Sequence, residues 1–285
     1  MPTTGADLID LTRYPIDQPG APLRARVVAD ARAQLATDGC AVLKGFLTPQ
    51  GIAALTAESE AQAKHAHHSH NRTNAYFTQD DPSLPADDPR RQFFDRSNAF
   101  IPADHFAQDG PLRQVHDFPG FDGFIQDCLQ EEKFHRYADP LADVIVNMAG
   151  AGNGFPWHFD TNNFTVTLAI QNAEAGGAFE YAPGIRSASD TGGENFEQVA
   201  RVLNGTSDQV RVLHLEPGDL QLFRGRYSLH RVAPLAGTRP RYVAIFSYVE
   251  EPDMVGSVTR TKQLYGRVLP IHLERAGQRA DSYID

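Results

Sequence analysis

The chain has 285 residues, of which 41% are hydrophobic and 22% are charged. This length and composition are typical of a globular protein with a full hydrophobic core, and they exclude a chain that is disordered throughout. With 36 acidic and 26 basic side chains, the formal net charge is -10. Because nucleic-acid binding depends on Lys and Arg clusters that neutralise phosphates, the charge balance argues against a nucleic-acid partner.

The cysteines and the N-terminal residues indicate the compartment. Cys40 and Cys128 are too few for a disulfide framework, and both lie in apolar runs, so we expect buried thiols. Residues 1–17 lack the apolar stretch of a signal peptide, and no segment approaches the roughly 18 apolar residues of a membrane span. We therefore expect a soluble, cytoplasmic protein without a membrane partner.

The N-terminal part is predicted to be mostly helical. Apolar residues recur at helical spacing over residues 21–37, and residues 40–46 follow as a short apolar strand. Thr48 is a typical N-cap and Pro49 suits the first turn of a helix, which we expect to continue past Ala63.

Two polar segments follow. Residues 64–70 contain four histidines, which could bind a metal, but we interpret them as the solvated end of the preceding helix. Residues 76–91 contain three X-Pro pairs that disfavour helix, which predicts an ordered excursion over the surface that could serve as a lid. Residues 111–132 are predicted to form a second helical block.

From about Tyr137 the pattern changes to short apolar runs separated by Gly, Pro and Asn. This pattern predicts several strands of a sandwich or jelly roll rather than a parallel α/β sheet. The predicted strands cover residues 143–147, 164–170, 177–181, 210–215, 219–223 and 242–248. Residues 192–204 could insert a helix, and residues 254–285 form a polar tail that we expect to pack on the strands.

A His-x-Asp pair, His158 and Asp160, lies at the start of this strand-rich part. On a strand these two side chains face the same side, so both can turn toward one ion. Taken alone, such a pair occurs easily by chance. Two further residues give it weight, because His230 and then Arg241 follow after several predicted hairpins.

This order of residues resembles the double-stranded β-helix oxygenases over residues 137–249. The resemblance implies a mainly β jelly-roll core at 137–250, helices of 1–136 packed around it, and residues 251–285 packed on the core, all in one domain. It also implies Fe(II), 2-oxoglutarate and O2 as cofactor and co-substrates. His158, Asp160 and His230 would then be both the metal ligands and the catalytic residues.

The chemistry requires these residue types. Two imidazoles and one carboxylate on one face of Fe(II) leave open positions for 2-oxoglutarate and O2. The far carboxylate of 2-oxoglutarate needs a cationic fork, which Arg241 can provide because it shares strand parity with Val243 and Ile245. Arg239 has the same parity and remains the alternative, although it lies nearer a loop and before Pro240.

A rival metal site combines His214 and Glu216 with His230. The residues between His214 and His230 are too few for the intervening barrel strands. Residues 210–215 also fit an ordinary strand that ends at the Pro217-Gly218 turn.

Within the superfamily, the sequence is most similar to halogenases and hydroxylases of free amino acids, including lysine. The similar pieces are residues 157–168, 76–97 and 263–267. Halogenases of this group carry a small residue at the position of Asp160, which opens a place for chloride. Because a carboxylate stands there in this chain, the resemblance implies hydroxylation rather than chlorination.

The implied substrate is a small polar molecule such as free lysine. Candidate substrate contacts are Arg96, Asn162, Glu180, Ser247 and Tyr265. Two alternatives stay open at this point. The enzyme could act on a protein side chain or a carrier-tethered residue, or the chain could be a cupin-like protein that binds metal without turnover.

Overall fold

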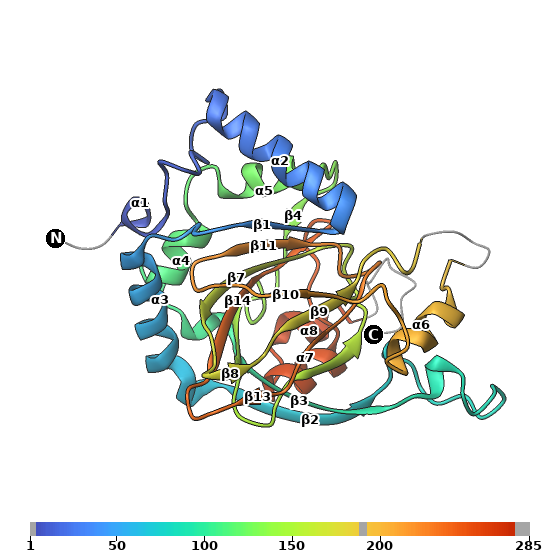
Figure 1. The fold of residues 1–285 in the computed structure, drawn as a ribbon. Coiled ribbons are helices and arrows are strands. Elements are labelled where there is room, and N and C mark those ends of the chain that lie inside the picture. The colour runs from blue at the N-terminus through green and yellow to red at the C-terminus, as the bar shows by residue number, and fades with distance from the viewer. Residues whose placement is uncertain (1–3, 188–192, 277–285) are drawn as a thin grey trace.

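The computed structural model describes residues 4–187 and 193–276 (Figure 1). Its helices are α1 (Gly5–Leu8), α2 (Pro22–Asp38), α3 (Pro49–Gln62), α4 (Pro111–His116), α5 (Phe121–Leu129), α6 (Phe196–Leu203), α7 (Val258–Tyr265) and α8 (Pro270–Glu274). Its strands are β1 (Cys40–Leu43), β2 (His67–Thr73), β3 (Phe94–Ile101), β4 (His135–Arg136), β5 (Val144–Ala149), β6 (Phe155–His158), β7 (Thr165–Gln171), β8 (Ala175–Gly176), β9 (Phe179–Ala182), β10 (Arg211–Leu213), β11 (Leu220–Phe223), β12 (Leu229–Val232), β13 (Leu235–Ala236), β14 (Arg241–Phe246) and β15 (Tyr248–Val249). Short 3-10 helices cover Ala63–His65, Pro89–Arg91 and Ala103–His105.

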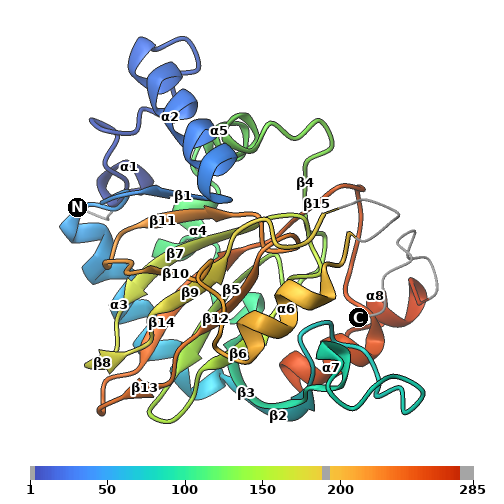
Figure 2. The same cartoon turned by 45° about the vertical axis from the view of Figure 1, so that its right-hand side comes forward.

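Two antiparallel sheets form the centre of the molecule (Figure 2). The larger sheet has the strand order β1-β11-β7-β14-β5-β3-β2, and the smaller sheet has the order β10-β9-β12-β6. The sheets face each other, because the rings of Phe179 and Tyr181 on β9 pack against Phe223 on β11, with centroid distances of 5.0 and 5.6 Å. This arrangement confirms the predicted jelly-roll core with helices around it.

Alternation along the strands decides which side chains face which layer. On β14, Tyr242, Ala244 and Phe246 belong to the main core cluster beneath the helices. Helices α2, α3, α4 and α5 supply the other side of that cluster, so they cover the outer face of the larger sheet (Figure 1). Helix α6 covers the smaller sheet, with Val199 and Val202 buried in one cluster with residues of β6, β9 and β12.

The first predicted helix and the N-cap of the second are confirmed. Residues 21–37 match α2, and the Thr48 hydroxyl accepts a hydrogen bond from the Gly51 N–H at 3.0 Å, with Pro49 in the first turn of α3. The α-helix ends at Gln62, and a 3-10 turn over Ala63–His65 continues the helical run, so the predicted extension past Ala63 holds for two residues only.

The interpretation of the histidine tract, residues 64–70, as a helix end holds for His65 but is wrong for the other three histidines. Residues His67–Thr73 form strand β2, which pairs with β3 along its whole length and extends the larger sheet. Exposed and partly buried side chains alternate along β2, so no apolar face revealed it in the sequence. The N-terminal part is therefore less helical than predicted.

Most other elements lie close to their predicted ranges. The block at 111–132 is two helices, α4 and α5, separated by Gly120 at φ 86°, where a Cβ atom would lie 2.3 Å from the Ile16 carbonyl oxygen. The excursion at 76–91 is confirmed, with one 3-10 turn at its end. Helices α7 and α8 form the C-terminal tail, whose last residues, 277–285, lie outside the described residues, as does residue 192 of the predicted 192–204 helix.

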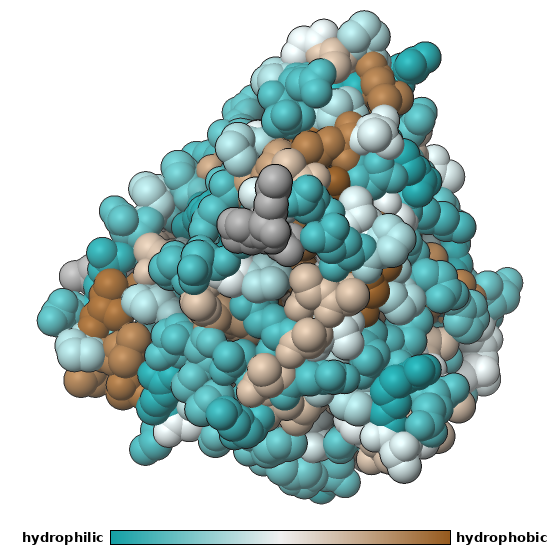
Figure 3. Space-filling view, turned by 90° about the vertical axis from the view of Figure 1, so that its left-hand side faces the viewer, coloured by the Kyte–Doolittle hydropathy of each residue, from teal (hydrophilic) through white to brown (hydrophobic). Residues whose placement is uncertain are grey.

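Both cysteines are buried free thiols, as expected. In the described part of the chain, no helix is long and apolar enough to cross a membrane. The face that carries α1 and α3 is mainly hydrophilic, and its apolar side chains gather in small separate patches (Figure 3).

Candidate metal centre

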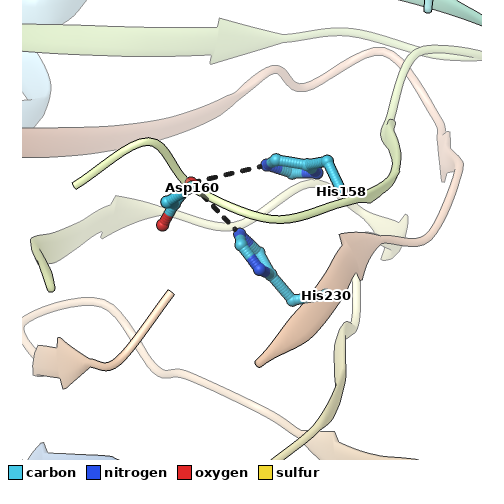
Figure 4. A group of neighbouring side chains, drawn as sticks. All are labelled: His158, Asp160 and His230. Carbon is cyan, nitrogen blue, oxygen red and sulfur yellow. Dashed lines mark ion pairs between the residues drawn. The ribbon is translucent and has the colours of Figure 1, made fainter. Parts of the chain in front are cut away.

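Three metal-binding side chains meet at one end of the jelly roll (Figure 4). His158 ends β6 and lies opposite His230 of β12 in the register of the smaller sheet. Asp160 follows two residues after His158, and its Oδ1 lies 3.7 Å from His158 Nε2 and 3.4 Å from His230 Nε2. Among the described residues, this is the only group of three or more His, Cys, Asp or Glu side chains with the spacing of a metal site.

The backbone fixes the orientation of both imidazole rings. His158 Nδ1 lies 2.8 Å from the Pro156 carbonyl oxygen, and His230 Nδ1 lies 2.9 Å from the Ser228 carbonyl oxygen. A carbonyl oxygen can only accept, so each Nδ1 carries the proton and donates it. The Nε2 lone pairs are therefore left to face the centre of the group, as in metal-binding histidines generally.

The carboxylate of Asp160 is held from behind. The Thr165 hydroxyl at the start of β7 donates a hydrogen bond to Oδ2 at 2.5 Å, and the Asp160 N–H donates to the Gly225 carbonyl oxygen at 3.1 Å. Gly225 has to be glycine, because a Cβ there would lie 1.9 Å from Asp160 Oδ2. With Oδ2 engaged, Oδ1 is the oxygen that faces the two imidazoles.

Electrostatics favours the protonation states that bind a cation. Burial lowers the pKa of His158 well below its usual value, and the neighbouring His230 and Arg96 act in the same direction. Burial alone would raise the pKa of Asp160, but His230, His158 and the Thr165 hydroxyl outweigh it and hold that pKa well below the usual range. The site thus presents a neutral imidazole and an ionised carboxylate, which suits a divalent metal.

Aromatic rings surround the histidines. Phe223 and Phe179 lie 4.8 and 5.6 Å from the His230 ring, and Phe155 lies 6.2 Å from the His158 ring, measured between centroids. These apolar neighbours limit the access of water to the site.

Arg241 occupies a cavity at the other end of the same interior. It is the first residue of β14, and the alternation on that strand turns it away from the helices and toward the smaller sheet. Its cavity has a volume of about 150 Å³ and is also lined by Gly177 and Phe179, the ring that packs on His230. Burial lowers the pKa of Arg241 to about 10, and within the described residues its guanidinium has no hydrogen-bond or ion-pair partner. A partly buried cation that faces a cavity and has no partner among the described residues indicates an anionic ligand.

The sequence left open another arginine for 2-oxoglutarate and another pair of metal ligands, and the structure places neither at the site. Arg239 is exposed, and its guanidinium donates to the carbonyl oxygens of Asn172 and Ala173 at 2.9 and 3.3 Å. His214 and Glu216 are both exposed and are not part of the metal-spaced group.

The predicted substrate contacts separate into two groups. Arg96 on β3 is only 5% exposed and lies close to the triad, since its guanidinium packs 5.4 Å from the Phe155 ring. Ser247 directly follows β14, on the inward parity of that strand. Asn162 lies exposed in the segment between Asp160 and β7.

Two of the predicted contacts lie elsewhere. Glu180 lies on the outer face of β9, because Phe179 and Tyr181 take the inner face, and Arg231 donates to its carboxylate at 2.7 Å. Tyr265 is buried in α7 against Phe100, not against the triad. We therefore leave Glu180 and Tyr265 out of the proposed site.

Sequence reasoning missed Thr165 and Gly225, which hold Asp160, and Phe77, whose ring lies 5.8 Å from the His158 ring. Gly225 stands between two arginines in the sequence, which gives no sign of a role beside Asp160. Thr165 could have been found, because it lies shortly after His158 and Asp160, on a predicted strand and at a position whose hydroxyl faces inward. Nothing in the local sequence marked Phe77.

Solved structures share this fold. A non-haem α-ketoglutarate-dependent epimerase, SnoN, from nogalamycin biosynthesis superposes with a TM-score of 0.54 at 13% identity, covering 79% of this chain and 84% of that one. A prolyl hydroxylase from Trichoplax adhaerens, in complex with a peptide fragment, gives 0.50 at 16% identity, covering 82% and 96%. An oxidoreductase of the 2OG-Fe(II) oxygenase family from Burkholderia pseudomallei gives 0.50 at 13% identity, covering 79% and 91%.

At the level of sequence, no curated protein matches this chain. The model of the family described as halogenase D matches residues 23–265, which include the whole metal centre and Arg241. The chain therefore belongs to the halogenase D family and is an oxygenase of the iron(II)- and 2-oxoglutarate-dependent kind.

Proposed function

We propose that this oxygenase hydroxylates an unactivated C–H bond of a small polar substrate, a free amino acid such as lysine. In the same reaction 2-oxoglutarate and O2 are consumed, and succinate and CO2 are released. The observation that carries the proposal is the convergence of His158 Nε2, His230 Nε2 and Asp160 Oδ1 at the end of the jelly roll.

The triad fits iron(II). Two nitrogen donors and one carboxylate oxygen on one side of a site are the ligand set of non-haem iron(II) oxygenases. The hydrogen bonds to Pro156 and Ser228 fix the donor nitrogens in advance, and Thr165 fixes the donor oxygen. When bound, the iron with 2-oxoglutarate and O2 supplies the oxidation of the C–H bond. The protein decides which C–H bond lies near it.

Arg241 would hold the far carboxylate of 2-oxoglutarate. Its guanidinium is partly buried and lacks a partner among the described residues, and its cavity shares the Phe179 ring with the metal centre. A carboxylate would supply a charge-assisted and bidentate partner for that guanidinium. This pairing would fix one end of the co-substrate and leave its other end toward the triad.

Asp160 favours hydroxylation over halogenation, although the family is described as one of halogenases. Its carboxylate fills the place and supplies the negative charge that a halide would otherwise supply. Asp160 is held in this position, since the Thr165 hydroxyl donates to its Oδ2 and its own N–H donates to the Gly225 carbonyl oxygen.

The surroundings of the triad favour a small substrate over a protein or carrier-tethered one. The 74–78 turn lies against the metal-binding segment, since the Phe159 N–H donates to the Ala75 carbonyl oxygen at 2.9 Å and the Phe77 ring lies beside His158. A polypeptide needs an open groove, which this turn narrows. Arg96 would bind a substrate carboxylate, with Asn162 and Ser247 as further polar contacts.

We also propose that residues 1–285 act as one domain. Strand β1 pairs with β11, and β3 pairs with β5, so the N-terminal part contributes to the same sheet as the core at 137–250. Separating the N-terminal part as its own domain would require breaking the hydrogen bonds of that sheet.

The test is a succinate-release screen with Fe(II), ascorbate and 2-oxoglutarate over the free proteinogenic amino acids. We expect at least one basic amino acid to stimulate release and to gain one oxygen atom by mass spectrometry. If succinate forms without any amino acid and none of the amino acids increases its release, free amino acids are not the substrates. No succinate under any condition would instead favour a cupin-like protein that binds metal without turnover.

A further inference from the structure

The 74–78 turn contains a strained aromatic residue. Phe77 has φ +57°, in the left-handed region that residues with a Cβ seldom adopt. A bulky residue keeps such a conformation only where the surrounding structure imposes it, and such residues cluster at functional sites. The surrounding structure must therefore impose the backbone conformation of Phe77, and the residue is a candidate for a function.

The cause is Asn74, which is 0% exposed. Its Oδ1 accepts the N–H groups of Tyr76 and Thr78 at 3.0 and 3.1 Å. Its Nδ2 donates to the Thr78 hydroxyl at 2.8 Å and to the Arg90 carbonyl oxygen at 2.5 Å. Four hydrogen bonds from one buried amide clamp both sides of Phe77 and fix the turn.

The turn is joined to the metal-binding segment. Phe159 lies between His158 and Asp160, and its N–H donates to the Ala75 carbonyl oxygen at 2.9 Å. The Tyr76 ring packs on the Phe159 ring at 5.3 Å. The position of Phe77 is therefore set relative to the two metal ligands on either side of Phe159.

The Phe77 ring also contacts two cations from other parts of the chain. Its centroid lies 4.8 Å from the Arg96 guanidinium carbon and 5.3 Å from that of Arg260 on α7. Both distances fit cation–π contacts. With His158 at 5.8 Å, the ring lies between a metal ligand and two arginines.

We propose that Phe77 is a lid residue that determines specificity: its ring, held over His158 by the Asn74 turn, limits the size of the molecules that reach the metal. The part about substrate size rests on the proposed function. The part about access to the metal does not, and it can be tested without a substrate.

Access is tested by extracting Co(II) from the Co(II)-loaded protein with EDTA. Phe77→Ala removes the ring, and we expect Co(II) loss to be faster by on the order of tenfold, equivalent to about 1.4 kcal/mol in the barrier. The matched control is Phe196→Ala on α6, which removes a ring that likewise contacts an arginine, Arg90 at 4.1 Å, and an aromatic ring, Tyr76 at 5.8 Å. Equal rates in the wild type and both variants would overturn the lid.

A second comparison tests the strain. Phe77→Gly removes the same ring but suits a positive φ, whereas Phe77→Ala keeps the strained Cβ. We expect the glycine variant to melt at a higher temperature than the alanine variant, by roughly 2–4 °C. An alanine variant that melts as high as the glycine variant would show that the backbone at Phe77 is not strained. This measurement also shows whether both variants fold.

The substrate arm uses succinate release over the proteinogenic amino acids. We expect Phe77→Ala to accept larger side chains than the wild type, and Phe196→Ala to keep the wild-type profile. An unchanged profile in Phe77→Ala would overturn the role in specificity. If the wild type itself releases no succinate, the proposed function fails, whereas the EDTA result still decides whether Phe77 closes the metal site.

Discussion

At the scale of single residues, the two triad histidines differ from ordinary buried histidines in how their nitrogens are used. In each ring Nδ1 donates to a backbone carbonyl two residues earlier, and Nε2 points at Asp160. Most buried polar atoms find a hydrogen-bond partner within the protein. Here the geometry leaves one lone pair on each ring for a ligand from outside the chain.

We predict that His158→Ala or His230→Ala abolishes iron binding and turnover together. Each substitution removes one of three protein ligands, and no other His, Cys, Asp or Glu group in the described residues has metal spacing. Iron content after gel filtration and succinate release measure the two effects. Either purified variant that still holds iron and produces succinate at the wild-type rate would contradict the triad.

Arg241→Ala should mainly raise the concentration of 2-oxoglutarate needed for half-maximal turnover. Loss of a charge-assisted pair in a buried site costs roughly 2–5 kcal/mol, which predicts an increase of at least about 30-fold. Arg239→Ala is the matched control, because the side chain of this exposed arginine donates to the Asn172 and Ala173 carbonyl oxygens and lies near the Glu174 carboxylate. A larger effect from Arg239→Ala would mean that the assignment is displaced by two residues.

The wild-type protein should hydroxylate, not chlorinate, its substrate even at high chloride concentration. The physical reason is that Asp160 is anionic and fixed by Thr165, so the site has neither space nor charge for a halide. Product mass in high chloride checks this, with Asp160→Gly as the variant that opens the space. A monochlorinated main product from the wild type would contradict the role given to Asp160.

At the scale of elements, the sequence predicted what depends on local pattern and missed what depends on pairing. Apolar alternation located the core strands, and parity placed Arg241 on the face of β14 opposite the helices. Strand β2 has no apolar face, and only its partner β3 makes it a strand, so the histidine tract was misread. Glu180 was misjudged because the inner face of β9 is set by contacts with the opposite sheet.

The residues that hold Asp160 were also missed, because their contacts join distant parts of the chain. These contacts join the start of β7 to the segment before β12, which are far apart in sequence, through Thr165 and Gly225. The pattern of apolar and polar residues in either segment does not predict this contact. The ligands themselves could be predicted from chain order, but the groups that orient them could not.

Removal of the Thr165 hydroxyl should weaken metal binding without removing a ligand. Thr165→Val keeps the shape of the side chain but leaves Asp160 Oδ2 without its donor, so the carboxylate can rotate. Loss of such orienting partners reduces metal affinity by roughly 10–100-fold. Competition for Fe(II) with a chromogenic chelator measures the change. Thr165→Ser should restore affinity, and an equally weak serine variant would point to packing as the cause.

At the scale of the whole molecule, stability depends on a buried histidine outside the metal site. His116 ends α4 and is 0% exposed, with its ring packed against Phe246 on β14 and Tyr248 on β15. Neither ring nitrogen has a hydrogen-bond partner within the described residues. Burial, aided by the charge of Arg136, lowers its pKa to about 4 from the ordinary value of 6.5 for histidine.

This pKa difference makes unfolding depend on pH in a definite direction. Between pH 6.5 and about 4 the unfolded chain binds a proton at His116 and the folded chain does not. Stability is therefore lost as the pH falls through this window, by about 3 kcal/mol in total, and it is fully present above it.

His116→Phe fits the aromatic surroundings and removes the titrating group. Denaturant unfolding of the metal-free variant should thus lose less stability from pH 7 to pH 4.5 than the wild type, whereas His68→Ala at an exposed position should follow the wild type. Parallel curves for His116→Phe and the wild type would mean that His116 is already protonated in the folded core.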